Sequence, residues 1–489
     1  MMDIDQTLKK AVALHTSGKL SEAEIAYRQI LEVFPNHPDA IHFMGVLAYN
    51  VGNNDVAREY IQKAIELSPN NAACFNNMGN VCQQQKKYHE AVSWYKQTIE
   101  LNPENTKAYN NLGVALSKLG RLDEALESIK AALKIDPAYF EAHNNLGETY
   151  RCLGMYDKAL KSCETVLGFV PESAQARWNR SILLLLKGDF QQGWSEYEWR
   201  WERPTTPKRK IDAGQVWDGS PLAGKTLFVY EEQGMGDTLQ FIRYLPLIKQ
   251  LGGYVIFEVL TPMIRLVESF NGFDRLWVGI RNVDTRPTDR FDFHIPLLSL
   301  PGIFNTTLEN IPADIPYLNV DKHLIQIWNK RIKDNNNFKV GIIWAGHPDH
   351  TNDNNRSTFL SAFSVLKEVK GVKLFSLQKE KYEKWTDINP AKVVEQDLGE
   401  ELSDFIDTAA IIENLDLVIS VDTAVVHLAG ALGKEVWTLL PFSPDWRWMI
   451  NREDSPWYPT MKLFRQSAPG DWESVFRKVK ECLVKHIKK

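Results

Sequence analysis

The sequence has few cysteines, and no two of them are spaced as in a metal or redox motif. The five are Cys74, Cys82, Cys152, Cys163 and Cys482. Without a C-x-x-C pair, neither a zinc site nor a disulfide framework is indicated. We expect these residues to serve as small hydrophobic side chains in a reducing compartment.

Long hydrophobic runs and an excess of basic charge are missing too. The longest aliphatic run, Ile182 to Leu186, is far too short to cross a bilayer. The first residues lack the basic and then apolar order of a secretory signal, so we expect a cytoplasmic protein with no integral membrane segment. The formal net charge is −5 and the basic residues are dispersed, which gives no electrostatic support for nucleic-acid binding.

What the sequence does contain is a repeat of 34 residues, marked by proline, glycine and alanine. The positions are Pro35, Pro69, Pro103, Pro137 and Pro171, then Gly45, Gly79, Gly113 and Gly147, and Ala23, Ala57, Ala91, Ala125 and Ala159. This period is typical of a two-helix unit in which small residues let the helices touch and proline ends each repeat. The period stops near Pro204, so the rest of the 489-residue chain is predicted to be a different structure.

Each unit resembles the tetratricopeptide repeat, with Ala108-Tyr-Asn-Asn-Leu-Gly113 opening one helix and Ala125 to Leu133 forming the next. The resemblance implies an α-solenoid arm over residues 1–207 that holds a protein or peptide. The last unit departs from the pattern, because aromatic residues such as Trp194 and Tyr197 crowd into it. We expect that unit to dock against the following domain.

A row of amides runs through the repeats at one fixed position. Its members are Asn77, Asn111, Asn145 and Asn179. One interpretation is a set of hydrogen bonds between neighbouring repeats. The other is an acceptor-binding ladder, because an amide can both donate to and accept from the backbone of an extended peptide. A similar ladder is typical of the repeat arm of protein O-GlcNAc transferases.

Beyond the repeats, short apolar runs alternate with helical stretches. Strands are predicted at 226–230, 254–260, 339–345, 372–377, 417–421 and 435–440, and a closing amphipathic helix after Asp471. This order indicates an α/β fold of two Rossmann-like halves, residues 208–330 and 331–489, divided by the polar stretch 329–337. Ligands of such sheets bind at the carboxyl ends of the strands.

The first chemically informative turn is Gly234-Met-Gly-Asp237. Gly234 and Gly236 permit close approach of the backbone to a ligand, and Asp237 stands at the start of a helix. Asp237 either caps that helix or accepts a proton from an acceptor hydroxyl, and one side chain can do both.

The second turn ends a strand at Val421 and begins a helix. Asp422, Thr423 and Ala424 lie at the helix start, where free N–H groups and the helix dipole favour a pyrophosphate. His427, one turn in, either reaches that anion or is an ordinary buried histidine. No second ligand at helical spacing accompanies it, so a metal role is not indicated.

The third candidate is a long polar loop that follows a buried strand. Trp344 ends the strand and is predicted to contact the donor, and Arg356 is the best candidate in the loop to neutralise phosphate. His347 and His350 are interpreted as ordinary loop histidines. Farther on, the tryptophan-rich stretch around Arg447 either stacks a base or sugar or packs the two halves together.

Together these turns resemble the heptosyltransferase-like glycosyltransferases (family 9), which have the GT-B fold. The resemblance covers about residues 222–470 and is strongest over Ser420 to Gly433. It implies that Asp237 is the catalytic base. It also implies that Asp422, Thr423, Ala424 and His427 contact the donor diphosphate, with Ala424 where the family has glycine and Arg356 near its phosphate-binding lysine.

The expected reaction is metal-independent, inverting transfer from a nucleotide-sugar donor, with no cofactor. The Asp-x-Asp spacing of metal-dependent transferases occurs only at Asp3 and Asp5, in the arm. A helix N-terminus and an arginine must then meet the leaving-group charge. On this view Asp237→Ala lowers transfer by several orders of magnitude and leaves folding and donor binding nearly intact. The alternatives are an inactive transferase domain used as a scaffold, and transfer to a lipid-linked or lipopolysaccharide acceptor.

Overall fold

The computed structural model describes residues 3–206, 209, 211, 213–280, 287, 290–332 and 336–488. Contacts within the chain divide it into two compact units, Met1–Ala176 and Arg177–Lys489. The predicted arm boundary at residues 207 and 208 lies outside the described residues, as does part of the predicted break at 329–337. By contact, the division falls earlier, in the first turn of a helix that begins at Ala174.

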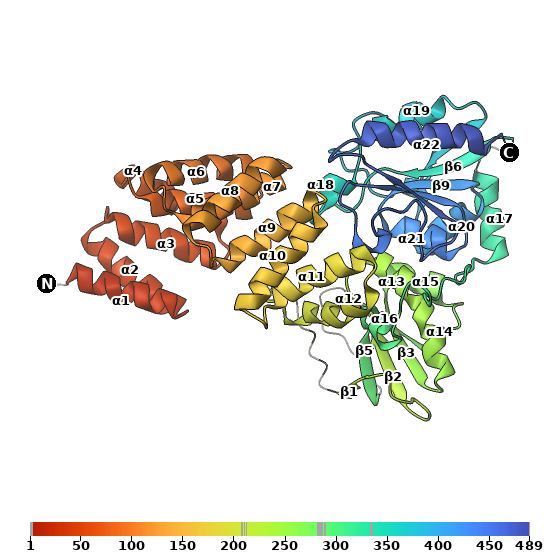
Figure 1. Ribbon diagram of the computed structural model, residues 1–489, viewed down its shortest axis with the longest axis horizontal. Helices are drawn as coiled ribbons and strands as arrows, with labels where there is room; N and C mark the ends of the chain where they lie inside the picture. Colours follow the sequence, from red (N-terminus) through yellow and green to blue (C-terminus); the bar gives the residue numbers. More distant parts are fainter. Residues whose placement is uncertain are drawn as a thin grey trace. The chain divides into compact units, whose positions relative to one another are not determined.

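The first unit is built from antiparallel helix pairs that follow the 34-residue period (Figure 1). The helices are α1 (Ile4–Thr16), α2 (Leu20–Val33), α3 (Pro38–Asn50), α4 (Asn54–Leu67), α5 (Ala72–Gln84), α6 (Tyr88–Leu101), α7 (Thr106–Lys118), α8 (Leu122–Ile135), α9 (Phe140–Cys152) and α10 (Tyr156–Phe169). The predicted helical solenoid is therefore confirmed.

The periodic glycines lie where the two helices of a pair cross. A β-carbon placed on Gly113 would lie 3.1 Å from the carbonyl oxygen of Ala125, and one on Gly79 would lie 2.5 Å from the ring of Tyr95. Neither position leaves room for a larger side chain, so the prediction that these glycines permit close packing is confirmed. At Gly147 the nearest atom would be Ser162 Cβ at 3.3 Å, which is a looser crossing.

The next helix pair, α11 (Ala174–Lys187) and α12 (Phe190–Tyr197), belongs to the second unit from Arg177 onward. Trp194 of α12 packs edge-on against Trp446, with ring centroids 5.2 Å apart, and its Nε1 donates to the Thr306 carbonyl at 3.1 Å. Phe190 stacks on Trp457 at 6.0 Å. The prediction that this aromatic unit docks against the following domain is confirmed.

The rest of the second unit is built on two parallel sheets, with helices between the strands. Their strands are β1 (Gln215–Val216), β2 (Thr226–Tyr230), β3 (Tyr254–Leu260), β4 (Arg275–Gly279), β5 (Phe293–Pro296), β6 (Phe338–Ile343), β7 (Val372–Ser376), β8 (Gln396–Asp397), β9 (Leu417–Val421), β10 (Val436–Leu440) and β11 (Met461–Arg465). The first sheet has the order β1-β5-β2-β3-β4 and the second β11-β10-β9-β6-β7-β8. The predicted α/β class is confirmed.

Helices cover both faces of the second sheet, with α19 and α22 on one face and α20 and α21 on the other (Figure 1). The α-helices of this part are α13 (Met235–Phe241), α14 (Leu245–Gln250), α15 (Ile264–Val267), α16 (Leu300–Ile303), α17 (Lys322–Arg331), α18 (Asp353–Arg356), α19 (Ser364–Lys367), α20 (Phe405–Glu413), α21 (Ala424–Ala431) and α22 (Trp472–His486). The 3-10 helices are η1 (Glu198–Glu202), η2 (Ile242–Tyr244), η3 (Thr261–Met263), η4 (Leu297–Ser299), η5 (Leu360–Phe363), η6 (Pro390–Lys392), η7 (Gly399–Glu401) and η8 (Trp446–Trp448). The predicted closing helix is α22.

The order of the strands fixes where a ligand can bind. Chain order reverses between β2 and β5 in the first sheet and between β6 and β9 in the second. In open parallel sheets the crevice outside the carboxyl ends of such a strand pair is the preferred ligand site. The turn after β2, the loop after β6 and the start of α21 after β9 all lie at these ends.

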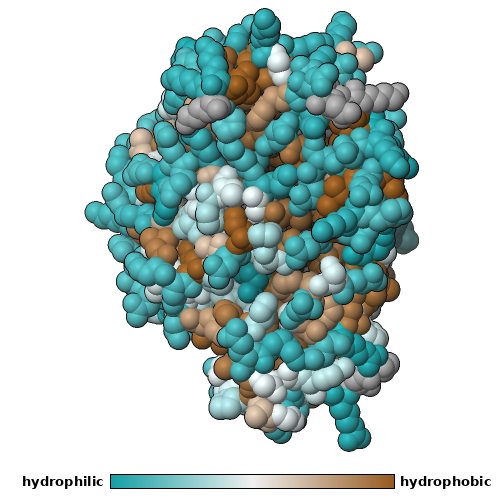
Figure 2. Space-filling model, turned by 90° about the vertical axis from the view of Figure 1, so that its right-hand side faces the viewer, coloured by the Kyte–Doolittle hydropathy of each residue, from teal (hydrophilic) through white to brown (hydrophobic). Residues whose placement is uncertain are grey.

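The surface shown in Figure 2 is mostly hydrophilic, with scattered hydrophobic patches. Among the described helices, none is long and apolar enough to cross a membrane.

Candidate functional site

Asp237 lies in the first turn of α13 and fastens that turn. Its Oδ2 accepts a hydrogen bond from the Gly234 amide at 2.7 Å, and its Oδ1 pairs with the guanidinium of Arg447. Burial raises the pKa of the Asp237 carboxyl, and the charge of Arg447 only partly offsets this. Asp237 therefore caps its helix, which is one of the two roles predicted for it. Its raised pKa also makes it a stronger base than an exposed aspartate.

Arg447 joins the two halves of the unit, because it comes from the second half and binds the first. Its Nε donates to Gln240 Oε1 at 2.8 Å, and its Nη1 donates to Asp445 Oδ1 at 2.9 Å. The guanidinium lies 4.3 Å from the ring centre of Trp446. The Arg447 side chain is only 8% exposed, so the packing interpretation of this tryptophan-rich stretch agrees with the structure.

The pairing of Arg447 with Asp237 and Gln240 was not predicted from the sequence. The sequence does place an arginine among tryptophans, and an arginine in a buried segment needs an anionic or amide partner. Nothing in the sequence selects that partner from residues more than 200 positions away.

The turn that carries Asp237 lies directly against the start of α21. A β-carbon placed on Gly236 would lie 3.0 Å from His427 Cδ2 and 3.3 Å from Ala424 Cα. Gly236 is therefore needed for close approach between two helices of the protein. Whether Gly234 and Gly236 also contact a donor stays a prediction.

At the carboxyl end of β9, Thr423 is the N-cap residue of α21. Its Oγ1 lies 3.2 Å from Ser420 Oγ. In the described part of the chain, no acceptor is paired with the amides of Ala424 and Val425, the first two of the helix. The pKa of Asp422 is raised to about 6, mainly by burial and then by the nearby negative charge of Asp445.

The loop after β6 is folded so that Arg356 meets Asp422. Asp353 accepts from Ser357 Oγ at 2.6 Å and from Trp385 Nε1 at 2.9 Å, which anchors the loop. Arg356 lies flat on Gly346, and its Nη1 donates to the Asp422 carbonyl at 3.1 Å. Its buried Nε has no hydrogen-bond partner among the described residues. Arg356 and Asp422 were predicted as separate candidates, and the structure brings them together.

His427 is buried one turn into α21. Its Nδ1 lies 3.0 Å from the Tyr458 hydroxyl, and its ring stacks on Trp448 with centroids 5.2 Å apart. Burial lowers the pKa of His427 to about 3, so the imidazole is neutral at physiological pH. The buried-histidine interpretation agrees with these contacts, and the predicted contact with a donor stays a prediction.

Trp344 does not fit its predicted donor-binding role. Its side chain is 0% exposed and packs in the core of the second half with Leu360 and Phe363. Its Nε1 donates to Thr386 Oγ1 at 3.3 Å. A residue at the end of a strand can point into the core or toward the crevice, and here the indole points into the core.

The amide row bridges successive helix pairs in the first unit. Asn77 Nδ2 lies 2.9 Å from His42 Nε2, Asn111 Nδ2 donates to Asn80 Oδ1 at 3.1 Å, and Asn145 Nδ2 donates to Asn110 Oδ1 at 2.9 Å. The interpretation as hydrogen bonds between repeats therefore holds for these three. Asn179 lies on α11, in the second unit. Their role in binding an acceptor stays a prediction.

The last question about the site is whether residues that can bind a metal lie together there. Among the residues that the structure describes, no three His, Cys, Asp or Glu side chains gather as a metal-binding group. The expectation of metal-free chemistry stays a prediction.

Comparison with known families identifies the helix pairs. Models described as tetratricopeptide repeat match residues 79–120, 106–139 and 129–161. The N-terminal part of this chain is a tetratricopeptide repeat array. A model described as anaphase-promoting complex, cyclosome, subunit 3 also matches, over residues 16–98 of the array.

The chain is also similar to Protein FlbA of Caulobacter vibrioides, with 26% identity over 345 residues. That match covers 65% of this chain and 56% of FlbA, so the similarity spans little more than half of that protein.

Among solved structures, PilF of Pseudomonas aeruginosa is 19% identical with a TM-score of 0.38, covering 42% of this chain and 93% of that one. YrrB, a TPR protein with an unusual peptide-binding site, is 23% identical with a TM-score of 0.30, covering 36% and 90%.

Proposed function

We propose that this chain is a glycosyltransferase of the GT-B type, which moves a sugar from a nucleotide-sugar donor to an acceptor without a metal and with inversion. One observation carries the proposal. The turn bearing Asp237, from one parallel sheet, lies against the N-terminus of α21, from the other, and Arg356 adjoins that N-terminus. The proposed base and the proposed anion site thus come from opposite halves of one unit.

The donor diphosphate is assigned to the start of α21. The amides of Ala424 and Val425 are aligned for an anion there, and the helix dipole favours negative charge. Arg356 Nε, which lies 4.0 Å from Asp353 Oδ1 and has no hydrogen-bond partner among the described residues, is beside the same helix start. We assign to this guanidinium the positive charge that a metal supplies elsewhere. His427 contributes a neutral ring, whose Nε2–H can donate to a phosphate oxygen if Tyr458 donates to Nδ1.

Asp237 is assigned as the base. The acceptor hydroxyl attacks the anomeric carbon, its proton passes to the Asp237 carboxylate, and the bond from that carbon to the phosphate oxygen breaks. A raised pKa suits this role because it makes the carboxylate a better proton acceptor. Arg447 keeps the carboxylate ionised before the acceptor arrives.

The acceptor is proposed to be a protein held by the tetratricopeptide repeat array. Arrays of this kind present long surfaces, and their repeats suggest a protein or peptide partner. In this array, Asn76 and Asn144 each have a buried side-chain oxygen with no partner among the described residues. Such oxygens, next to the bridging amide row, can accept from the backbone of an extended peptide.

Donor binding tests the proposal most directly. The full-length protein is mixed with UDP-, GDP-, ADP- and CMP-sugars in the presence of EDTA, and thermal unfolding is recorded. A donor at about 100 times its Kd stabilises the folded state by roughly 2.7 kcal/mol, which shifts Tm by several degrees. Arg356→Ala should weaken that donor roughly tenfold or more, because a charge-assisted hydrogen bond is lost.

The matched control is Arg331→Ala. Arg331 is also an arginine of the second half, but it pairs with Glu401 on the surface, so its removal should leave donor affinity unchanged. If no donor raises Tm, the transferase proposal fails and the inactive scaffold becomes the better interpretation. If both variants lose affinity equally, Arg356 has no specific part in donor binding.

A further inference from the structure

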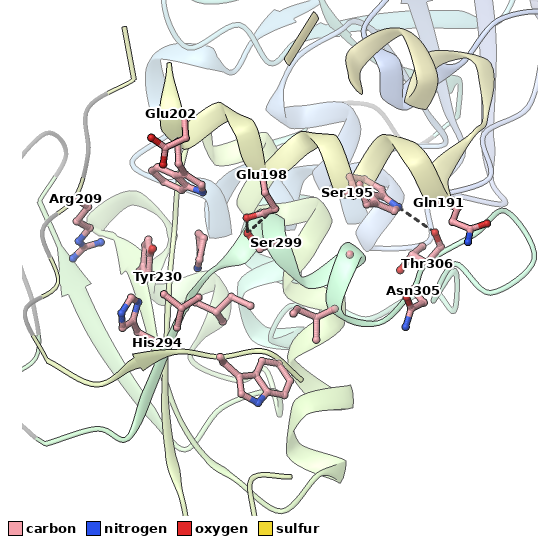
Figure 3. A pocket seen from close by; sticks show the side chains of 18 of the residues that line it. Gln191, Ser195, Glu198, Glu202, Arg209, Tyr230, His294, Ser299, Asn305 and Thr306 are labelled. Carbon is pink, nitrogen blue, oxygen red and sulfur yellow. Dashed lines mark hydrogen bonds between the residues drawn. The ribbon is translucent and has the colours of Figure 1, made fainter. Parts of the chain in front are cut away.

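A cavity of about 780 Å³ lies in the second unit, away from the residues assigned to transfer. It is bordered by α12 and η1 on one side and by the carboxyl ends of β2 and β5 on the other, and it is open to solvent (Figure 3). Its volume is in the range of sites for small organic ligands. None of Asp237, Arg356, Asp422 and His427 lines it.

Aromatic side chains form much of its wall. Trp201 of η1 is partly exposed. Trp194 of α12, Trp217 directly after β1 and Tyr230 of β2 are almost fully buried and form the apolar wall behind it. Aromatic rings offer flat apolar faces beside polar edges, and this combination suits a ring-shaped ligand whose C–H groups lie on one face.

The wall also carries hydrogen-bonding groups. Glu198 accepts from Ser299 Oγ at 2.8 and 2.9 Å, yet its side chain remains 49% exposed (Figure 3). Arg200 fixes this part of the wall, because it pairs with Glu198 at 2.7 Å and with the buried Glu232 at 2.7 and 2.8 Å. The carboxylate is therefore held in place and can still accept from a ligand.

Two lining side chains have unsatisfied nitrogen atoms. His294 is only 9% exposed, and neither its Nδ1 nor Trp201 Nε1 has a hydrogen-bond partner within the described residues. A buried polar atom left unpaired costs roughly 1–3 kcal/mol. Hydroxyl groups of a ligand can satisfy both atoms, because a hydroxyl both donates and accepts.

The charges that line the cavity disfavour an anion. Glu198 and Glu202 both contribute carboxylates. Among the described lining residues, the one arginine is Arg209, and it is paired with Glu258, Nη2 to Oε1 at 3.0 Å. Burial, followed by the charge of Arg209, lowers the pKa of His294, so its ring stays neutral.

We propose that this cavity binds a neutral sugar ring, through aromatic stacking and hydroxyl contacts to Glu198, Trp201 and His294. The site is separate from the proposed donor site, since no residue assigned to the diphosphate lines it. The proposal therefore stands whether or not the chain transfers sugar.

Saturation-transfer NMR on the full-length protein tests it, with glucose, galactose, mannose and N-acetylglucosamine as probes. At least one should show saturation transfer, and glucose 6-phosphate should show none, because two carboxylates repel it. Ser195→Trp should reduce the signal at least tenfold, since Ser195 lies on α12 and lines the cavity. Gln192→Trp is the matched control, because Gln192 is exposed on the same helix and does not line the cavity.

Several outcomes would overturn the proposal: silence of all four sugars, equal signals in Ser195→Trp and Gln192→Trp, or equal binding of glucose 6-phosphate. If Ser195→Trp fails to fold, Gln191→Trp, at another exposed lining position, replaces it. Arg356→Ala should keep the sugar signal. If the signal disappears in that variant, the sugars bind at the donor site and the cavity is not their site.

Discussion

Replacing Asp237 by asparagine should weaken the fold and stop transfer, by two separate routes. The carboxylate pairs with Arg447, whose side chain is 8% exposed. Removing one partner of a buried ion pair costs about 3–5 kcal/mol. Arg447 keeps Gln240 and Asp445, and asparagine can still accept from Gly234, so we expect a loss near the lower end, about 3 kcal/mol. This revises the sequence-based expectation that substitution of Asp237 leaves folding nearly intact.

Urea unfolding followed by tryptophan fluorescence measures this loss of stability in the second unit, where Asp237 and Arg447 lie. Of the 15 tryptophans, Trp94 alone precedes Arg177, so the fluorescence reports mainly on the second unit. Arg447→Met should cost a similar amount, because it leaves Asp237 buried without its cation. The double variant should lose less than the sum of the two single variants, which identifies the ion pair as the source.

A transfer assay separates the effect of Asp237→Asn on catalysis from its effect on stability. Asp237→Asn should lose transfer by several orders of magnitude, whereas Arg447→Met should retain part of it, provided that both are assayed below their unfolding transitions. An Asp237→Asn protein that unfolds at the wild-type urea concentration would refute the structural part of this reasoning. Wild-type transfer by the same variant would remove Asp237 from the mechanism.

Two other predictions follow from the site and the array. The pKa of Asp422 is raised to about 6, so the folded state binds a proton more tightly than the unfolded state and this group favours folding at low pH. Its contribution should fall as pH rises from about 4 to 6, and a comparison of urea midpoints with Asp422→Asn that shows no pH dependence would contradict it. Asn111→Ala and Asn145→Ala should each cost about 1 kcal/mol through a lost inter-repeat hydrogen bond. If the row also grips a peptide, transfer to protein should fall while donor hydrolysis is unchanged, and equal loss of both would mean a folding role alone.

The parts of this molecule that repeat or alternate were open to prediction from sequence. The 34-residue spacing marked the helix pairs from α1 to α10: a proline follows each pair, and a glycine lies where the helices cross in the four pairs from α3 to α10. The strands β2, β3, β6, β7, β9 and β10 were predicted because buried parallel strands are continuous apolar runs. The strands β1, β4, β5, β8 and β11 were not predicted. Arg356 was chosen because a long polar loop after such a strand has few structural reasons to exist. The structure places it against Asp422, and its role in donor binding stays a prediction.

Other features depend on pairings that no local pattern records. Trp344 follows β6 directly, at a position where ligand-binding residues also occur, and only the packed core shows which way its indole points. The cavity draws its walls from residues 191–202, 209, 216–217, 230 and 294–307, and no one of these segments carries a motif.

The position of the domain division has a practical consequence for dissecting this protein. Sequence signatures suggest excising the repeats together with their last, aromatic-rich member. In the structure, Trp194, Phe190 and Arg200 from that member pack on Trp446, Trp457 and Glu232. A shortened chain that starts after residue 207 would lack Trp194, Phe190 and Arg200. The aromatic surfaces around Trp446 and Trp457 would then be exposed to solvent. A cleanly separated C-terminal fragment should instead start at or before Arg177.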